Sequence, residues 1–353
     1  MKPVVLRIAP LVFLSVLVLP PSAPAADYYD LQAERTARNI AAVQDYQGTL
    51  EQKGLFGDAT VVSEVAFRRP HEFRVRVTAP AELAGTAMSY HDNELLVWWP
   101  KQEIGLRLAG FVAPSSATEA ARVKAAYAAN LENYLYGLGP VRDVAGLPTV
   151  QVDQRARGAG QLVQSSLTRV YDEYSFPLAG NASFRGGAKL EYAWKTIGFN
   201  QPARALPPVP QLPASALVVT WDLGWPDRAA AEAAARVPKA RPMPEALAGL
   251  KRTKLIVHPE SLPAIAGWYR DADEYLFVAA SRDTGFNAFS REYGLEVPLG
   301  GGRARLVITP LNSLWQFRHD GVVYDVLTNL HPEVAYRTLA MHFAPAAAPA
   351  GKR

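Results

Sequence analysis

The stretch FRRPHEFRVRVTAPAELAGTAMSYHDNELLVWWP, from Phe67 to Pro100, predicts three antiparallel strands joined by two turns. In the first strand Phe73, Val75 and Val77 fall on one side, and charged or hydroxyl side chains fall on the other. This period of two is typical of a strand with one buried face. A proline stands near each end of the strand, where its missing N–H costs no ladder hydrogen bond.

The last strand of this stretch has to be covered on both faces. A short strand at Thr86–Tyr90 is followed by His91-Asp92-Asn93, a polar turn of residues that tolerate left-handed dihedrals, and then by Leu95–Trp99. Every position of Leu95–Trp99 is apolar, so one face is expected to meet a helix of the same domain. The other face must meet a second element, a partner or an apolar ligand.

The same stretch resembles a family of exported proteins, the LolA-like lipoprotein carriers and their RseB-like relatives. The resemblance rests on FRRPHEF at 67–73, on Ala79-Pro80, on the turn at 91–93 and on Trp98-Trp99-Pro100, with Asn93 where the family commonly has Gly. It implies an α+β fold in which a curved antiparallel half-barrel sheet wraps around helices and leaves an apolar hollow. It also implies that lipoprotein acyl chains or lipid bind in that hollow.

The candidate ligand-binding residues are apolar or aromatic side chains of the expected sheet. Such residues are equally typical of an ordinary core, and the sequence leaves both readings open. Those proposed to line the hollow are Phe67, Phe73, Val75, Tyr90, Val97, Trp98, Trp99, Tyr134 and Trp194, and Tyr192 belongs to the same aromatic set.

Arg69 matches the arginine of the family's basic-Arg-Pro motif. In the family this residue holds the carrier closed by hydrogen bonds to loop or helix backbone, so the resemblance implies a gating role for Arg69. The neighbouring Arg68, Arg74 and Arg76 either contact an anionic headgroup or partner, or form a solvated outer face.

Leu55 and Phe56 stand in a turn flanked by glycines. Apolar residues exposed on a loop tip suggest a contact site for another molecule, whereas the same residues folded inward would be core. We expect a contact loop at this pair.

The N-terminus predicts export. Lys2 and Arg7 precede an apolar run, Ile8–Leu19, and Ala23-Pro24-Ala25 gives a small-x-small cleavage pattern, so residues 1–25 read as a signal peptide. The apolar run is shorter than the roughly 20 residues of a membrane span, and an uncleaved anchor is the alternative. The sequence contains no cysteine, which excludes disulfides and lipid attachment to a cysteine. The mature protein is expected to be soluble in the periplasm, with no integral membrane segment.

The 353 residues are enough for two domains. We expect a LolA-like domain at 27–200, a Pro-rich linker at 201–215, a smaller α+β domain at 216–343 and a disordered tail at 344–353. Within the first domain the spacing predicts helices at Asp27–Asp45 and Thr118–Leu138, and a connecting segment at Glu173–Gly187. The expected second-domain elements, all strands except the two helices named, are 216–223, helix 228–235, 250–258, 274–281, 303–310, 314–319, 322–327 and helix 332–342.

The second domain resembles one that follows carrier-like domains in exported proteins of spore-forming bacteria. The resemblance rests on AAAEAAARVP at 229–238 and on the hairpin and helix within LWQFRHDGVVYDVLTNLHPEVAYRTLAMHF at 314–343. RseB-like proteins have a comparable two-domain layout. This resemblance adds architecture rather than function.

The sequence carries no recognisable catalytic pattern. Its six histidines form no close metal-ligand pair, there is no G-x-S-x-G motif, and Gly300-Gly301-Gly302 lacks the Lys of a phosphate loop. The net charge of +4 does not indicate nucleic-acid binding. We therefore expect a binding protein that is not an enzyme and uses no cofactor or metal. It carries acyl chains or lipid, or as the alternative it regulates an envelope response by sensing lipoprotein or glycolipid and binding a membrane-anchored partner.

Overall fold

The structure is a computed structural model that describes residues 25–69, 72–111, 130, 132–201, 205–259, 263–271, 274–282, 293–309 and 312–344. The expected signal peptide, the tail and most of the helix predicted at 118–138 lie outside these residues. The chain divides into two compact units. Unit 1 comprises the residues up to 184 and residues 189–220, and unit 2 comprises residues 185–188 and those from 221 onward.

Unit 1 is built on a 12-stranded sheet in the order β12-β6-β5-β4-β3-β2-β1-β11-β10-β9-β8-β7. From β6 to β7 every neighbouring pair is antiparallel. The elements are α1 (Ala25–Ala42), β1 (Asp45–Phe56), β2 (Ala59–Arg68), β3 (Glu72–Ala79), β4 (Ala87–His91), β5 (Glu94–Trp99), β6 (Ile104–Ala109), β7 (Tyr134–Val144), β8 (Leu147–Ala156), β9 (Val163–Tyr171), β10 (Phe176–Phe184), β11 (Lys189–Phe199) and β12 (Leu217–Asp222).

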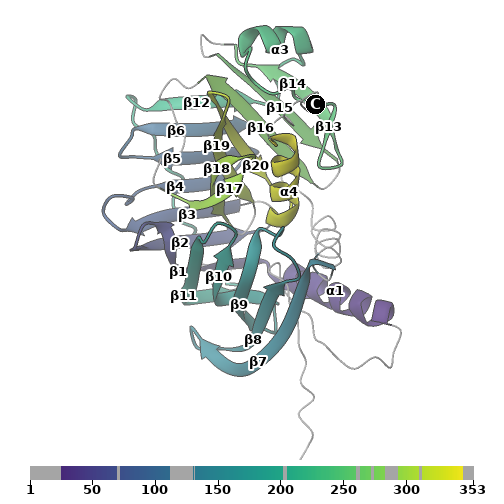
Figure 1. Cartoon of the computed structure of the whole chain (residues 1–353). Coiled ribbons are helices and arrows are strands. Elements are labelled where there is room, and N and C mark those ends of the chain that lie inside the picture. Colours follow the sequence, from purple (N-terminus) through teal and green to yellow (C-terminus); the bar gives the residue numbers. More distant parts are fainter. Residues whose placement is uncertain are drawn as a thin grey trace, which may run out of the picture. The chain divides into compact units, whose positions relative to one another are not determined.

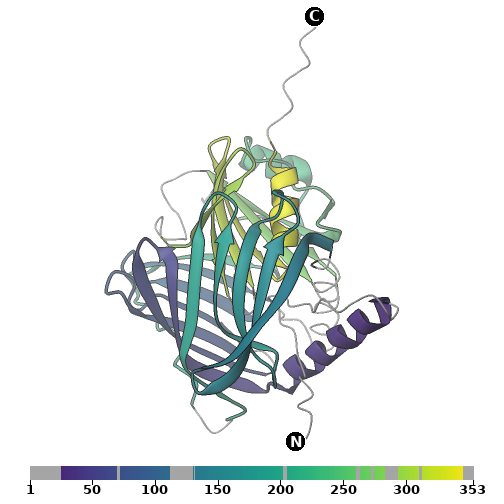
Figure 2. The ribbon, with the colours of Figure 1, turned by 60° about the horizontal axis from the view of Figure 1, so that its bottom comes forward.

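The sheet of unit 1 is strongly curved, with β7–β11 running across the direction of β1–β6 (Figure 1 and Figure 2). The register shifts between Thr49 and Leu50 in the β1–β11 pair and between Val62 and Ser63 in the β2–β3 pair. Such bulges bend a strand and increase its local twist. At the first bend Gly48 is required, because a Cβ there would stand 2.0 Å from the carbonyl oxygen of Thr196. The α+β class and the curved antiparallel sheet predicted from the sequence are confirmed.

Two predicted hairpins have the turn chemistry that the sequence indicates. Asp92 and Asn93 join β4 to β5 with φ values of 50° and 60°. In unit 2, Asp320 and Gly321 join two strands with φ values of 51° and 77°. Two successive left-handed residues match the right-handed twist of the flanking strands, and Asn, Asp and Gly adopt this conformation at the lowest cost.

Two predictions for unit 1 are wrong within the described residues. Tyr134–Leu138, expected to end a helix, begin β7, where Tyr134 and Tyr136 are buried and Leu135 between them is exposed. Three apolar residues in a row, Tyr134 to Tyr136, are compatible with a helical turn. They are equally compatible with a strand whose middle residue is apolar but exposed, and this is what the structure contains. The segment Glu173–Gly187, expected to be a connection, contains β10. Its Pro, Gly and Asn disfavour a strand, but pairing with both β9 and β11 overrides that preference.

The strand predicted at 216–223 exists as β12, but it joins the sheet of unit 1 rather than the second module. β12 lies next to β6, and the amide of Leu217 donates to the carbonyl oxygen of Glu103 at 2.8 Å. The described part of the Pro-rich segment before it, residues 205–213, forms no helix or strand.

Unit 2 contains an eight-stranded antiparallel sheet in the order β13-β14-β15-β16-β20-β19-β18-β17, with helices α3 and α4. β15 and β17 were not expected from the sequence, whereas the closing helix matches its predicted bounds. The elements are α3 (Ala230–Arg236), β13 (Ala246–Leu247), β14 (Leu250–Val257), β15 (Ala264–Arg270), β16 (Tyr275–Arg282), β17 (Leu295–Leu299), β18 (Gly302–Ile308), β19 (Ser313–His319), β20 (Val322–Thr328) and α4 (Pro332–His342).

Helix α4 covers one face of the unit 2 sheet. It begins with Pro332 at its first turn, and the ring nitrogen of His331 accepts a hydrogen bond from the amide of Glu333 at 3.3 Å. At its other end the ring of Phe343 lies 4.6 Å from that of Phe317. A buried aromatic ring of this kind supplies a large part of the apolar area that fixes a helix to a sheet.

The opposite face of the same sheet carries Asp325. Gln316 donates a hydrogen bond to its carboxylate at 2.7 Å, and desolvation by burial raises the pKa of Asp325 to about 6. An acid with a raised folded-state pKa destabilises the fold when it is ionised. The free energy of unfolding therefore falls as the pH rises from about 4 to about 6, and the full cost is present above that range.

We expect Asp325→Asn to stabilise unit 2 at pH 7.5, because the amide has no charge to bury and still accepts the bond from Gln316. The expected gain is between about 1 and 3 kcal/mol, and it shrinks toward pH 5. Denaturant unfolding at both pH values measures it. Asp320→Asn is the matched control, since that side chain is 71% exposed in the next turn. A loss of stability at pH 7.5 would show that the charge of Asp325 is useful to the fold.

Candidate functional site

One face of the unit 1 sheet carries continuous apolar rows. Residues directly opposite each other on antiparallel strands point to the same face, so the register defines these rows. We call this face the inner face. One row is Phe199, Tyr46, Phe67, Phe73, Tyr90, Leu95 and Leu108, and the next is Gly48, Val65, Val75, Met88, Val97 and Leu106.

The inner face is concave where β1 approaches β10. The rings of Tyr46 and Phe176 come from these strands, which β11 separates, yet their centroids are 4.9 Å apart. Trp194 of the intervening β11 lies 5.9 Å from Tyr46. Side chains two strands apart meet only where the sheet bends toward them, because neighbouring strands are about 4.8 Å apart.

Most of the residues predicted to line a hollow share the inner face. Phe67, Phe73, Tyr90, Val97 and Trp99 are buried there on β2–β5, and Val75 is half-buried. Tyr134 and Trp194 point to the same face from β7 and β11 and are also buried.

Trp98 does not belong with them. It pairs with Ala87 and Gly105 and therefore points to the opposite face. A Cβ on Gly105 would lie 3.5 Å from the Trp98 ring and 3.4 Å from Val218 of β12. Trp98 thus packs on the outer side of the sheet, and alternation along Leu95–Trp99 was a sufficient signal to separate it from Val97 and Trp99.

The expected exposed pair at Leu55 and Phe56 is wrong for Leu55. Both residues lie within β1, where Leu55 is 2% exposed and Phe56 is half-buried. The turn is shorter than predicted, with Gly57 and Asp58 at its tip, so Leu55 falls on the buried side of the strand.

Arg69 joins the sheet to the C-terminal end of α1. Its Nε donates to the carbonyl oxygen of Val43 at 2.8 Å, and its NH2 group donates to that of Ile40 at 3.1 Å. The last carbonyls of a helix have no partner within the helix and carry partial negative charge, so a guanidinium suits them. Its Cζ also lies 5.8 Å from the centroid of the Phe67 ring, next to the aromatic row. The family resemblance identified this residue, whereas the helix end that it binds was not predicted.

Three further contacts hold the C-terminal half of α1. Arg35 forms an ion pair with Asp172 at 3.3 Å, and Asn39 donates to the hydroxyl of Ser175 at 3.0 Å. Asn200, which follows β11, donates to the carbonyl oxygen of Ala42 at 3.2 Å. Together with the two Arg69 bonds, we call these the α1 contacts. They connect the helix to the β2–β3 connection, the β9–β10 turn and the end of β11.

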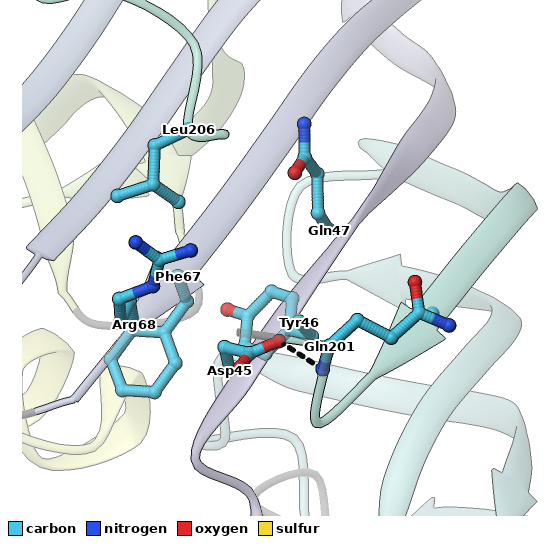
Figure 3. A pocket seen from close by; sticks show the side chains of 8 residues that line it. Asp45, Tyr46, Gln47, Phe67, Arg68, Gln201 and Leu206 are labelled. Atoms are coloured by element: carbon cyan, nitrogen blue, oxygen red, sulfur yellow. Dashed lines mark hydrogen bonds between the residues drawn. The ribbon is translucent and has the colours of Figure 1, made fainter. Parts of the chain in front are cut away.

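The outer face of β1–β3 is occupied by the Pro-rich segment. Figure 3 shows a small open depression where Leu206 lies beside Arg68 and the amide of Gln201 donates to Asp45 at 2.7 Å. Arg74 donates to the carbonyl oxygen of Pro207. The depression has no enclosed volume for a chain-like ligand. The sequence left open whether Arg74 and Arg76 contact an anionic partner or form a solvated outer face. In the structure Arg74 holds the Pro-rich segment, and Arg76 pairs with Glu64 at 2.8 Å.

The described residues show neither a metal site nor a membrane helix. Within the ranges that the structure describes, no three side chains of His, Asp or Glu gather to hold a metal ion. No helix in the same ranges is long and apolar enough to cross a bilayer. The two cross-strand rows of the inner face contain no charged side chain, so they can exclude water from an apolar ligand.

Comparisons with known proteins return similar structures. No family model matches the chain. No curated protein matches it either. The crystal structure of MucB is 16% identical and covers 92% of this chain and 98% of its own, with a TM-score of 0.42. A MucA/MucB complex from Pseudomonas aeruginosa is 16% identical and covers 92% and 100%, with a TM-score of 0.39. A LolA superfamily protein from Nitrosomonas europaea is 11% identical and covers 50% and 94%, with a TM-score of 0.22.

The last of these structures is that of a LolA superfamily protein, the group that the Phe67–Pro100 stretch resembles. The identities are 16% or lower and the TM-scores are below 0.5, so the likeness concerns the fold alone.

Arg69→Leu should loosen α1, because it removes both guanidinium bonds to the helix end. A hydrogen bond to a charged group is worth about 1.5–3 kcal/mol, so we expect amide exchange in residues 33–43 to accelerate at least about tenfold. Hydrogen-exchange mass spectrometry measures the effect. Arg76→Leu is the matched control, since Arg76 is exposed and bonds Glu64 instead. Equal protection of α1 against exchange in both variants would show that Arg69 does not hold the helix.

Proposed function

We propose that this chain binds the acyl chains of a lipoprotein or lipid on the inner face of unit 1. It then acts as an exported carrier or chaperone of the envelope without catalysis. The observation that carries the proposal is the pair of uncharged apolar rows that crosses β1–β6 on a concave sheet. The resemblance at Phe67–Pro100 supports the same ligand class.

The energetics suit such a ligand. Each methylene removed from water contributes about 0.8 kcal/mol, so a single long acyl chain gains several kcal/mol on this surface. The gain needs no specific polar contact, which fits rows that consist of Val, Leu, Met, Phe, Tyr and one Gly. The acyl chain could bind at several positions along the surface, and chains of different length could bind.

Helix α1 is the closing element in this proposal. Besides the buried Ala33 and Ala37, its attachment includes the polar α1 contacts of Arg69, Asp172 and Asn200. Arg69 lies beside Phe67 of the aromatic row. A few hydrogen bonds can break and re-form with a small net change in free energy, because water replaces the lost partners. Arg69 would thereby gate the inner face, as the resemblance implies. Release then requires an acceptor that binds the chains better.

We expect the protein purified from the periplasm to retain lipid that native mass spectrometry detects. After lipid removal, Val75→Asp should weaken rebinding of palmitate at least about tenfold, because it places a carboxylate in an apolar row. Thr78→Asp is the control, since Thr78 is exposed on the same strand. Circular dichroism establishes that both variants are folded.

Three results separate the alternatives. Retained lipid together with sensitivity to Val75→Asp supports the carrier. A stable membrane-anchored protein partner recovered from envelope extracts, with no transfer of chains to an acceptor, would favour the regulator. Absence of lipid and equal palmitate binding by both variants would contradict any ligand on the inner face.

A further inference from the structure

The inner face changes character between its two halves. On β7–β11 and the adjoining end of β1, the strand pairing places two further rows of residues on the inner face, and several of these residues are polar. The two rows there are Leu138, Val152, Thr168, Gly180, Tyr192 and Gln52, and Tyr136, Gln154, Ser166, Ala182 and Leu190. We call Gln154, Ser166, Thr168 and Tyr192 the polar patch.

The polar patch has two buried members and two half-buried ones, Ser166 and Tyr192, and it is partly paired within itself. Gln154 and Thr168 are 7% and 4% exposed. The hydroxyl of Ser166 donates to the side-chain oxygen of Gln154 at 2.9 Å. Buried polar groups cost stability unless they are satisfied, so Gln154 and Thr168, together with two half-buried polar neighbours on a face that is otherwise largely apolar, require a reason.

Tyr192 supplies the observation that points to a ligand. Its ring lies over Gly180, where an added Cβ would meet the phenol oxygen at 3.0 Å. The hydroxyl is enclosed, and the Thr168 side chain interacts with it and partly offsets the effect of burial on its pKa, but no described residue meets it at full hydrogen-bonding geometry. An enclosed hydroxyl that is left without a well-aligned partner loses up to about 1–3 kcal/mol, part of which an incoming acceptor would recover. Desolvation by burial raises the pKa of Tyr192, so it remains a proton donor at neutral pH.

The lack of charged side chains in the two rows of the patch indicates which class of ligand it could bind. None of the residues in its two rows is ionisable at neutral pH. Arg155 and Arg169 on the neighbouring strands pair with Ser165 and Gln151, which places them on the opposite face. A phosphate here would lose its hydration without gaining a cation, whereas hydroxyl groups would find both donors and acceptors.

The patch is continuous with the apolar rows. Trp194 stands two residues from Tyr192 on β11, and its ring contacts Tyr46 of the aromatic row at 5.9 Å. An amphiphile could therefore place its chain along β1–β6 and its head on β8–β11 within one face.

We propose that the polar patch binds the uncharged, hydroxyl-bearing head of an acylated ligand, such as a glycerol or an unphosphorylated sugar. This rests on the proposed function, because the acyl chain must occupy the inner face. Tyr192 donates to a head-group oxygen, and Ser166, Thr168 and Gln154 exchange hydrogen bonds with its neighbours.

The test compares probes that share a sixteen-carbon chain, in competition against a fluorescent fatty acid, with the full-length protein. Monopalmitoylglycerol carries a diol, methyl palmitate carries no hydroxyl, and palmitoyl lysophosphatidic acid carries a phosphate. Hexadecyl glucoside replaces the glycerol by a sugar. We expect the wild type to prefer monopalmitoylglycerol, hexadecyl glucoside or both over the other two probes by at least about fivefold, the free energy of roughly one hydrogen bond.

Tyr192→Phe should remove about fivefold of that preference and leave the affinity for methyl palmitate unchanged, since only the hydroxyl is lost. Ser166→Ala should act in the same direction. Tyr171→Phe is the matched control, because its hydroxyl bonds Glu173 outside the patch.

The outcomes distinguish failure of the head-group site from failure of acyl-chain binding. Equal affinities for all probes, unaltered by Tyr192→Phe, would overturn the head-group site and leave acyl binding intact. A preference for the phosphate probe would also overturn it. Failure of every probe, methyl palmitate included, would overturn the proposed function itself.

Discussion

Alternation along an antiparallel strand is the constraint on which this structure depends. Once the hairpin at Asp92 and Asn93 sets the register of β4 against β5, each residue of the neighbouring strands is committed to one face. A shift of one position would bring Trp98 and Arg74 to the inner face and Val97 and Val75 to the outer one. The apolar rows, the Pro-rich segment on the outer face and the polar patch all follow from that single register.

The sequence predicted the parts of the fold whose signal is local. The β3 alternation, the two left-handed turns and the closing helix at Pro332–His342 depend on residues adjacent in the chain, and the structure contains them. β10 and β12 could not be predicted in the same way. Pro177 and Gly180 disfavour a strand, and β12 finds its partner β6 far away in sequence. In both cases pairing with distant strands decided the outcome.

The positions of the candidate side chains could be predicted only in part. Arg69 was identified through a motif, and the structure supplies what the motif lacks, namely the carbonyl oxygens of Ile40 and Val43 at the end of α1. Trp98 and Leu55 show the limits of choosing residues by type. Both are large and apolar, but their side of the strand, rather than their chemistry, determines whether they can reach a ligand.

The two kinds of interaction in unit 1 differ in how easily they can be exchanged. The apolar rows lower the free energy in proportion to the area withdrawn from water, whether a helix, a loop or a guest covers it. The α1 contacts are directional and few, so they define one closed arrangement without making it costly to leave. A binding protein that must both shield and release a chain needs this combination.

Photo-crosslinking with a diazirine-bearing palmitate tests the central claim most directly, because it reports where the chain lies. The account predicts adducts on peptides that contain the inner-face residues of β3–β5, with Val75, Met88 and Val97 modified and competition by unlabelled palmitate. Adducts confined to unit 2 or to outer-face positions such as Arg76, or labelling that palmitate does not compete, would contradict it.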